Sequence, residues 1–417
     1  MTAQDLRISR RTFGALTAAA AAAVGLPATL RTASAQEQTT ITWFTFTAVP
    51  DHEEDLQKMI DAFEAANPDV KIEVQTAAYA DYFTELQTRI AGGDAPDAYE
   101  LNYENFVSYA SKGVLADVTA SAADVASKFY PKAFEAFQYD GKQFGLPTSF
   151  SDVVLFYNAD LFDAAGQAYP TADWTWTEEE AAAAALTGDG VWGAYSPITF
   201  HELYKTAAQN GGAFFGADSS VTINEPAVVE ALQYLLDYQE KGYQPTDADM
   251  AGVPNEDLFE QGEIAMLTTG IWLLPNFADA PFKWGIAVEP GKTQKASHFF
   301  SNAAVVSGDS DKQDAAWKWI SFLAGSDETA KIRVDASWEL PAVSNQDVFA
   351  SYLALTPPDD RQPVLDALDS AVVPPVIEKQ AQMQDAVNAL LEQVRGGELT
   401  PQEALDQAKT EIEALLA

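Results

Sequence analysis

The 417-residue chain contains no cysteine and only three histidines. The absence of cysteine excludes disulfide bonds, thiolate nucleophiles, thiolate-ligated metal clusters and a lipid anchor on cysteine. His52, His201 and His298 are too few and too scattered along the sequence to indicate a histidine-based metal site. These absences remove much of the chemistry on which enzymes rely.

Basic residues are also scarce. The chain has 24 Lys and Arg against 62 Asp and Glu, a formal net charge of −38. Such a charge repels nucleic-acid phosphates and anionic lipids, so we expect neither as a partner. The acidic excess fits a hydrated surface suited to high external salt. Calcium binding, for example around residues 247–257, is the alternative, but no EF-hand spacing is present.

Apolar residues are plentiful, yet they form no long run in the mature chain. Hydrophobic residues make up 47% and aromatic residues 11% of the sequence, which is ample for a packed core. The length predicts two or three domains at about 150 residues each. We therefore expect a soluble, folded protein.

The first 35 residues have the pattern of an export signal. The sequence SRRTF at residues 9–13 precedes a mostly alanine stretch that Gly25 and Pro27 interrupt, and Ala-Ser-Ala at 33–35 matches a signal-peptidase site. The paired arginines and the weakly hydrophobic core resemble a twin-arginine (Tat) signal. The alternative is the basic N-terminus of a cytosolic protein. We predict Tat export, in the folded state, to the periplasm or the outside.

Strand and helix patterns alternate at the start of the mature chain. Residues 39–47 and 70–74 alternate apolar and polar side chains, as strands do, and 97–101 reads as a third strand. Apolar residues at helical spacing over 56–63, and a further segment at 82–91, predict the intervening helices. This order predicts a parallel α/β sheet with ligands at the carboxyl ends of its strands.

Later segments carry clear start and stop signals. Residues 141–147 read as a turn, and 153–157 as a strand. Thr177, followed by three glutamates and an alanine run, indicates the start of a capped helix, and 227–238 is helical. Thr-Pro-Gln-Glu at 400–403 is a capping box that opens a last helix.

An ordered set of short segments resembles a known family. The chain is similar to the extracellular solute-binding proteins of carbohydrate ABC transporters, the family that contains maltose-binding protein. The segments are ITWF at 41–44, GGDAPD at 92–97, GKQFGLP at 141–147, FYN at 156–158, YP and WTW at 169–176, NGG at 210–212, and GEIAM followed by GIW at 262–272.

The resemblance implies an α/β protein with the two-lobe, type II-like periplasmic-binding-protein fold. Hinge crossings between the lobes are expected near Phe150, Asn302 and Pro357. The implied lobes are residues 36–150 with about 302–357, and 151–301 with about 358–417. A sugar would bind between the lobes, which close around it by a hinge motion.

The resemblance also implies a binding protein and no enzyme. Family members do no chemistry on their ligand and deliver it to ABC transporter permease subunits. We accordingly expect no catalytic residue, no metal and no cofactor, and we expect a monomer.

A sugar site needs aromatic platforms and hydrogen-bonding groups, because sugars have apolar ring faces and a rim of hydroxyls. The resemblance places Trp272, two residues after Gly270, where the family stacks an aromatic ring on the sugar; the alternative is a core tryptophan. We predict ligand contact at Phe44 and Thr45, at the end of the first strand, and leave Trp43 open between ligand and core.

Polar candidates come from several later segments. Glu104 and Asn105 follow the third strand, where the family places groups that grip hydroxyls, although Glu104 could instead be a surface residue. Ser151 stands where maltose-binding protein has a carboxylate, which puts a maltose-like specificity in doubt. His201 matches an aromatic contact position, or it caps a helix. The remaining predicted contacts are Phe300, Trp338 and Gln384.

We therefore predict the substrate-binding component of an ABC importer for a di- or oligosaccharide or a glycoside. Two alternatives remain: a binding protein for another uncharged solute, such as a polyol or a compatible solute, and a secreted glycoside hydrolase with two carboxylates. An anionic solute would need clustered basic residues, and no G-x-S-x-G or P-loop motif occurs.

Overall fold

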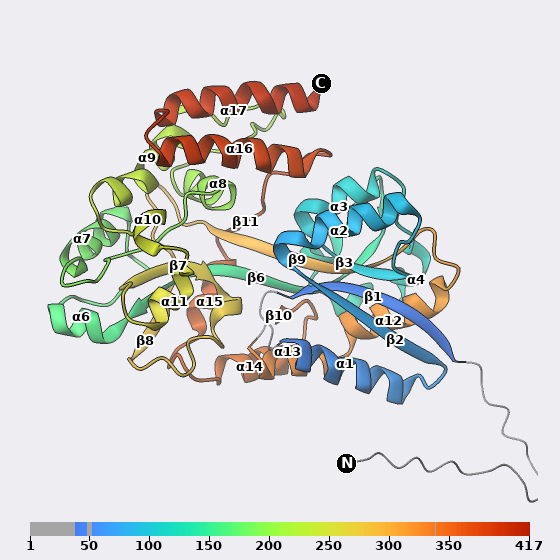
Figure 1. Cartoon of the computed structure of the whole chain (residues 1–417). Coiled ribbons are helices and arrows are strands. Elements are labelled where there is room, and N and C mark those ends of the chain that lie inside the picture. Colours follow the sequence, from blue (N-terminus) through green and yellow to red (C-terminus); the bar gives the residue numbers. More distant parts are fainter. Residues whose placement is uncertain (1–37, 48–51, 338) are drawn as a thin grey trace, which may run out of the picture. The chain divides into compact units, whose positions relative to one another are not determined.

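The computed structural model describes residues 38–47, 52–337 and 339–417 (Figure 1). The predicted signal segment and Trp338 lie outside these residues. Within the described ranges, no helix combines the length and the apolar character needed to cross a membrane.

The described chain opens with strands and helices in alternation. β1 lies between β2 and β3 and runs parallel to both. The carboxyl end of β3 leads directly into α3, so the predicted strand–helix–strand order is confirmed. These elements are β1 (Thr39–Thr47), α1 (His52–Ala66), β2 (Val70–Ala78), α2 (Tyr79–Gly92), β3 (Ala98–Asn102) and α3 (Tyr103–Ala110).

Two long strands continue the sheet. β6 (Gly145–Asn158) pairs antiparallel with β9 (Ser297–Val306) along its first half, and with β7 (Met266–Gly270) and β8 (Trp284–Ala287) along its second half. β9 in turn pairs antiparallel with β3. In the part of the chain that the structure describes, the sheet has nine strands, with β10-β6-β9-β3-β1-β2 as its longest path.

Helices cover this sheet, and of the short strands in the described residues the first two pair with each other in a separate two-stranded sheet. The remaining helices are α4 (Thr119–Ala123), α5 (Pro131–Glu135), α6 (Ala159–Ala165), α7 (Trp176–Leu186), α8 (Phe200–Gln209), α9 (Pro226–Glu240), α10 (Asp247–Met250), α11 (Asn255–Glu260), α12 (Gln313–Gly325), α13 (Asp327–Asp335), α14 (Gln346–Leu353), α15 (Gln362–Leu368), α16 (Gln380–Arg395) and α17 (Pro401–Leu416). The short strands are β4 (Gln138–Tyr139), β5 (Lys142–Gln143), β10 (Leu340–Pro341) and β11 (Ala371–Val372), and the 3-10 helices are η1 (Ala126–Lys128) and η2 (Ile271–Leu273).

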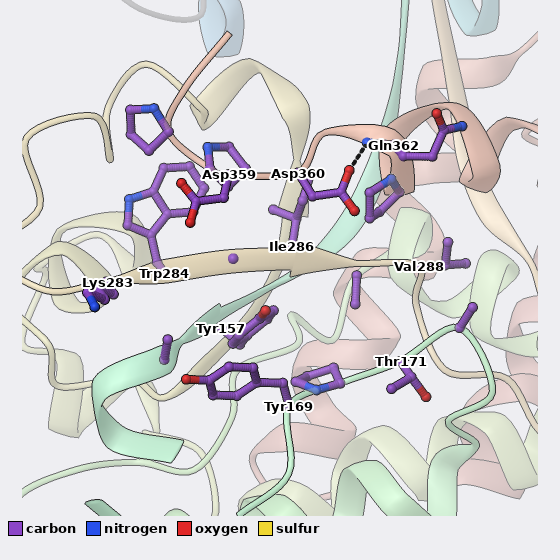
Figure 2. Close-up of a pocket in the computed structure, with 18 of the residues that line it drawn as sticks. Tyr157, Tyr169, Thr171, Lys283, Trp284, Ile286, Val288, Asp359, Asp360 and Gln362 are labelled. Carbon is purple, nitrogen blue, oxygen red and sulfur yellow. Dashed lines mark hydrogen bonds between the residues drawn. The ribbon is translucent and has the colours of Figure 1, made fainter. Parts of the chain in front are cut away.

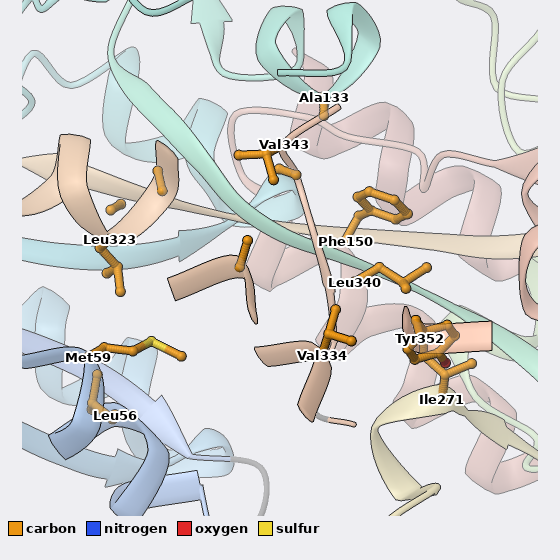
Figure 3. Close-up of a cluster of buried hydrophobic side chains, with 14 of the residues drawn as sticks. Leu56, Met59, Ala133, Phe150, Ile271, Leu323, Val334, Leu340, Val343 and Tyr352 are labelled. Carbon is orange, nitrogen blue, oxygen red and sulfur yellow. The ribbon is translucent and has the colours of Figure 1, made fainter. Parts of the chain in front are cut away.

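The main core joins segments that are far apart in the sequence. Leu56 and Met59 on the predicted apolar face of α1 belong to the same buried cluster as Phe150 of β6, Leu323 of α12 and Tyr352 of α14 (Figure 3). A second cluster lies among α8, α9, α16 and α17. The last helices therefore pack on the middle of the chain, as the upper part of Figure 1 shows.

Three sequence predictions about boundaries have definite outcomes. The capping box at residues 400–403 opens α17, as predicted. The cap of α7 is Thr175 and not Thr177, because the Thr175 side chain accepts from the helix backbone while Glu178 binds the Thr175 backbone. Residues 145–147 were predicted to be in a turn but belong to β6, since their backbone pairs with β9.

Trp43 is a core residue. It is buried, and its ring meets that of Trp319 edge to face at 6.0 Å between centroids. The sequence left this position open between core and ligand, and the packing places it in the core.

Candidate functional site

A helix at the end of β3 presents a buried carboxylate. The Asn102 side chain caps α3 by accepting a hydrogen bond from the Asn105 backbone N–H at 3.1 Å. Glu104 lies in the first turn of this helix, where a negative charge is favourable. Its residue exposure is only 2%, so the surface alternative for Glu104 is wrong.

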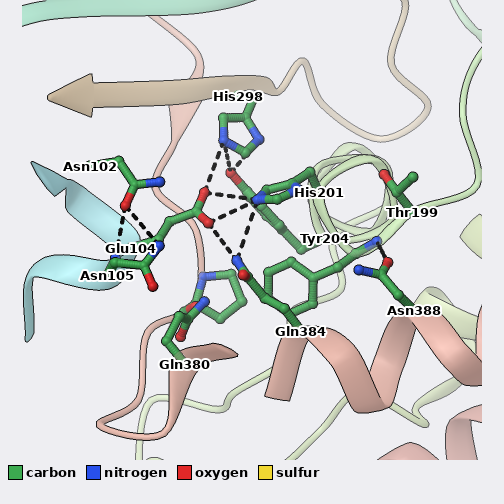
Figure 4. A network of polar contacts seen from close by, with 12 residues as sticks. Asn102, Glu104, Asn105, Thr199, His201, Tyr204, His298, Gln380, Gln384 and Asn388 are labelled. Carbon is green, nitrogen blue, oxygen red and sulfur yellow. Dashed lines mark hydrogen bonds and ion pairs between the residues drawn. The ribbon is translucent and has the colours of Figure 1, made fainter. Parts of the chain in front are cut away.

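Side chains from three distant elements meet this carboxylate (Figure 4). His201 of α8 places Nε2 at 2.8 and 3.0 Å from the two carboxylate oxygens. Gln384 of α16 donates a short hydrogen bond from its amide to Glu104. His298 of β9 lies slightly farther away, with Nε2 at 3.7 Å. These four residues form the Glu104 cluster.

The charges in the Glu104 cluster support one another. Burial opposes ionisation of Glu104, but the two histidines outweigh it and hold the pKa of the carboxyl well below its usual range. Burial also opposes protonation of His201, yet Glu104 raises the pKa of His201 above its ordinary value.

His298 differs from His201 in its protonation. Burial lowers the pKa of His298 to about 3, so this ring is neutral at physiological pH. The Tyr204 hydroxyl lies 2.6 Å from Nδ1 of His298, where it can donate to the unprotonated nitrogen. His298 then carries its proton on Nε2, which faces Glu104.

Aromatic rings continue the cluster along β9. Phe300 stacks on His298, and Trp272 meets Phe300 edge to face at 5.4 Å between centroids. Trp272 lies in η2, just beyond β7, and its ring crosses Gly270 so closely that a Cβ at Gly270 would be 2.0 Å from Cζ3 of the indole. Glycine is therefore required at 270 for this placement of the tryptophan. His298, Phe300 and Trp272 thus form an aromatic row, which offers flat apolar faces beside hydrogen-bonding groups.

A second buried polar group lies at the end of β1. The Thr45 hydroxyl donates to Glu100 of β3, and Arg333 of α13 lies 3.8 Å from Glu339. Asn302 of β9 donates to Glu339 at 3.3 Å. Burial raises the pKa of Glu100 to about 7, despite the Thr45 hydrogen bond and the charge of Arg333.

The structure brings together five of the ten predicted site residues. They are half-buried or buried around the Glu104 carboxylate and the aromatic row: Glu104, His201, Trp272, Phe300 and Gln384. Ser151 is close to them, because its backbone pairs with Phe300, although it is itself buried.

The other predicted residues have different places. Phe44 is 1% exposed and stacks on Tyr82 at 4.6 Å, so the structure places it in the core and not with the Glu104 cluster. Thr45 belongs to the second polar group, and the Asn105 side chain donates to Asn102 within the helix cap. Trp338 lies outside the described residues.

Sequence reasoning did not select several residues of these networks. Glu100 is one of them, since an acidic residue inside a predicted strand reads as a solvent-facing position. Tyr204, Arg333 and Glu339 lacked any local motif. Asn302 was expected only as a hinge crossing and His298 entered only the count of histidines, although the aromatic and polar stretch HFFSN at 298–302 offered a signal.

A separate groove lies between β8, the loop at 169–172 and the segment before α15 (Figure 2). Its volume is about 770 Å³, and its lining includes Tyr157, Tyr169, Asp359 and Asp360. It shares no residue with the Glu104 cluster and contains none of the predicted contacts. The Glu104 cluster is therefore the candidate site.

Comparisons with known proteins identify the family and the fold. A family model described as bacterial extracellular solute-binding protein matches residues 58–347. The structure of an ABC substrate-binding protein from Listeria monocytogenes in complex with cycloalternan is 50% identical, with a TM-score of 0.88 over 91% of this chain and 99% of that one.

More distant matches are also named as sugar-binding proteins. The galactooligosaccharide-binding protein of Bacillus subtilis is 24% identical over 85% of this chain and 84% of its own length. The cyclic α-maltosyl-1,6-maltose binding protein of Arthrobacter globiformis has a TM-score of 0.74 at 23% identity, over 91% of this chain and 99% of that one. The fold likeness confirms the predicted two-lobe α/β fold class. The chain belongs to the family of bacterial extracellular solute-binding proteins.

Proposed function

We propose that this protein is the sugar-binding component of an ABC importer and that its ligand is an oligosaccharide of the cycloalternan type. The observation that carries the proposal is the 50% identity, over 91% of the chain, to a protein solved with cycloalternan. Relatives named for galactooligosaccharide, maltodextrin and a cyclic maltosyl-maltose support the wider class.

The chemistry of the candidate site supports the same class of ligand. Glu104 is an acceptor for hydroxyl groups, while His201 and Gln384 carry donors. Trp272 and Phe300 supply flat apolar surfaces next to these groups. This combination suits an uncharged polyhydroxyl ligand.

The finer points of this function are also proposals. The ligand binds between two lobes, divided near Phe150, Asn302 and Pro357, and leaves unchanged for the permease subunits. The chain acts as a monomer after Tat export and does no chemistry on the sugar.

Isothermal titration of the purified mature chain tests this function. The panel is cycloalternan, cyclic α-maltosyl-1,6-maltose, maltose and mannobiose. Cycloalternan should bind most tightly, and at 100 times its dissociation constant it should stabilise the fold by about 2.7 kcal/mol. Chromatography after incubation should recover it intact. Binding of none of the four sugars, or the appearance of hydrolysis products, would overturn the proposal.

A further inference from the structure

The Glu104 carboxylate is already bound by the protein itself. His201 approaches both oxygens, and Gln384 donates to one of them. Because only 3% of the Glu104 side chain is exposed, a sugar hydroxyl reaches the carboxylate only if one of these neighbouring side chains moves aside. The protein's own contacts to Glu104 thus compete with the ligand.

These contacts also connect parts of the chain that the proposed division assigns to different lobes. α3 carries Glu104 and belongs to the N-terminal lobe, whereas α8 and α16 belong to the C-terminal lobe. A further contact joins the same parts, because the Ser108 hydroxyl of α3 donates to the Glu378 carbonyl at 2.6 Å. The Glu104 contacts, which Figure 4 shows, and the Ser108 bond together connect α3 directly to the segments around α8 and α16.

We propose that Glu104, His201 and Gln384 form a clasp that holds the two lobes together without a ligand, and that protonation of His201 tightens it. The proposal concerns the site of the proposed function and rests on that function for its role in uptake. The clasp itself follows from the protein's own contacts, so it can be tested with no sugar present.

The ion pair of the clasp joins Glu104 to His201. His201 is 33% exposed at its side chain and lies beside a carboxylate, so it can exchange protons with solvent. His298, which also faces Glu104, is neutral and bound to Tyr204. The other charged or titratable groups around the clasp are Tyr79 from α2 and Glu202, Tyr204 and Lys205 from α8.

The sign of the pH effect follows from the His201–Glu104 pair. Because Glu104 raises the pKa of His201 only when the two residues are in contact, the closed arrangement binds a proton more tightly than the open one. The closed arrangement is therefore favoured at low pH, and its advantage is lost as the pH rises through the raised pKa. The closed-to-open ratio should change by about tenfold for each unit by which contact raises that pKa.

Single-molecule energy transfer measures this ratio directly. Because the chain has no cysteine, Thr84→Cys on α2 and Ala389→Cys on α16, both at exposed positions, accept dyes at defined sites. Without sugar, we expect the closed population to decrease markedly from pH 5.5 to pH 8.5. Equal populations at both values would overturn the proposal.

Three variants identify the responsible group. His201→Gln and Glu104→Gln should each abolish the pH dependence while circular dichroism confirms that they fold. His52→Gln changes a histidine in α1, outside the cluster, and should keep it. A pH dependence that persists in His201→Gln would refute the clasp. Failure to bind cycloalternan would refute the proposed ligand and leave this result unaffected, so the two failures are distinguishable.

Discussion

Gly270 offers a way to move one indole ring without deleting it. A methyl group at this position would lie 2.0 Å from Cζ3 and 2.1 Å from Cη2 of Trp272. A Cβ atom essentially never lies within 3.0 Å of a non-bonded heavy atom, so the ring must move by about 1 Å or more. Gly270→Ala therefore displaces the aromatic surface that we assign to the ligand.

The expected loss can be worked from the contacts of the ring. The edge-to-face contact with Phe300 is of a kind worth about 0.5–1.5 kcal/mol. At about 1.4 kcal/mol per factor of ten, loss of a comparable contact to the sugar weakens binding by about twofold to twelvefold. Trp272→Ala removes the whole platform and should cost about 2 kcal/mol or more, roughly thirtyfold.

Calorimetric affinity for cycloalternan, measured beside the ligand-free melting temperature, separates the two possible roles of Trp272. Its ring is half-buried at the edge of the main core, so the glycine variant should melt close to the parent protein. Gly396→Ala is the matched control, because its new methyl group would meet nothing closer than 3.5 Å at φ −74°. That variant should bind normally.

One result would refute the reasoning. If Gly270→Ala and Trp272→Ala both bind with parental affinity while their melting temperatures fall, Trp272 is a core residue. Its truncation would then cost about 3–5 kcal/mol of folding stability.

Three further predictions concern charge. The melting temperature should rise from low to molar NaCl, because salt shortens the screening length from about 10 Å at 0.1 M to about 3 Å at 1 M. This screening relieves the repulsion within a chain whose formal net charge is −38. A melting temperature that does not change with NaCl would show that the acidic surface is not a salt adaptation. Lys205→Met should lower the free energy of unfolding in urea by about 3–5 kcal/mol, because it leaves Glu202 and Glu289 buried without their cation. Lys241→Met is the control: it removes an exposed ion pair with Glu180 and should lower the free energy of unfolding by less than about 1 kcal/mol. Burial raises the pKa of Glu100 from its ordinary 4.5 to about 7, so the free energy of unfolding of the parent protein should fall by up to about 3 kcal/mol as the pH rises through this window. Glu100→Gln should not show this fall. If the free energies of unfolding of the two proteins differ by the same amount at pH 5 and at pH 8, the prediction is contradicted.

The fold was largely readable because its strands and helices carry regular patterns. The alternation over residues 39–47 predicted β1 with the same bounds, and the spacing of Leu56, Met59, Ile60 and Phe63 identified the buried face of α1. Boundaries were harder where two residues offer the same chemistry. Thr175 and Thr177 are each followed by a glutamate three residues later, so both fit a capping box, and the structure forms the reciprocal bonds at Thr175.

The candidate site was predicted in part, for a physical reason. Glu104, His201 and Gln384 are up to 280 residues apart, and no local pattern indicates that they meet. The order of family segments supplied that information. Phe44 shows the limit of such reasoning, because both faces of a parallel sheet are covered and an aromatic ring at a strand end can point to either side. Buried acidic residues such as Glu100 were missed because charge usually indicates exposure.

The packing of α16 and α17 against α8 and α9 has a consequence for how the chain acquires its structure. Residues 380–416 complete a layer that begins near residue 200, so this layer cannot form until those residues have left the ribosome. Contacts over such sequence distances make folding slow, and the earlier helices keep apolar faces exposed in the meantime. Removal of α17 should therefore leave a partly folded chain with exposed apolar helix faces, and such a chain should bind chaperones.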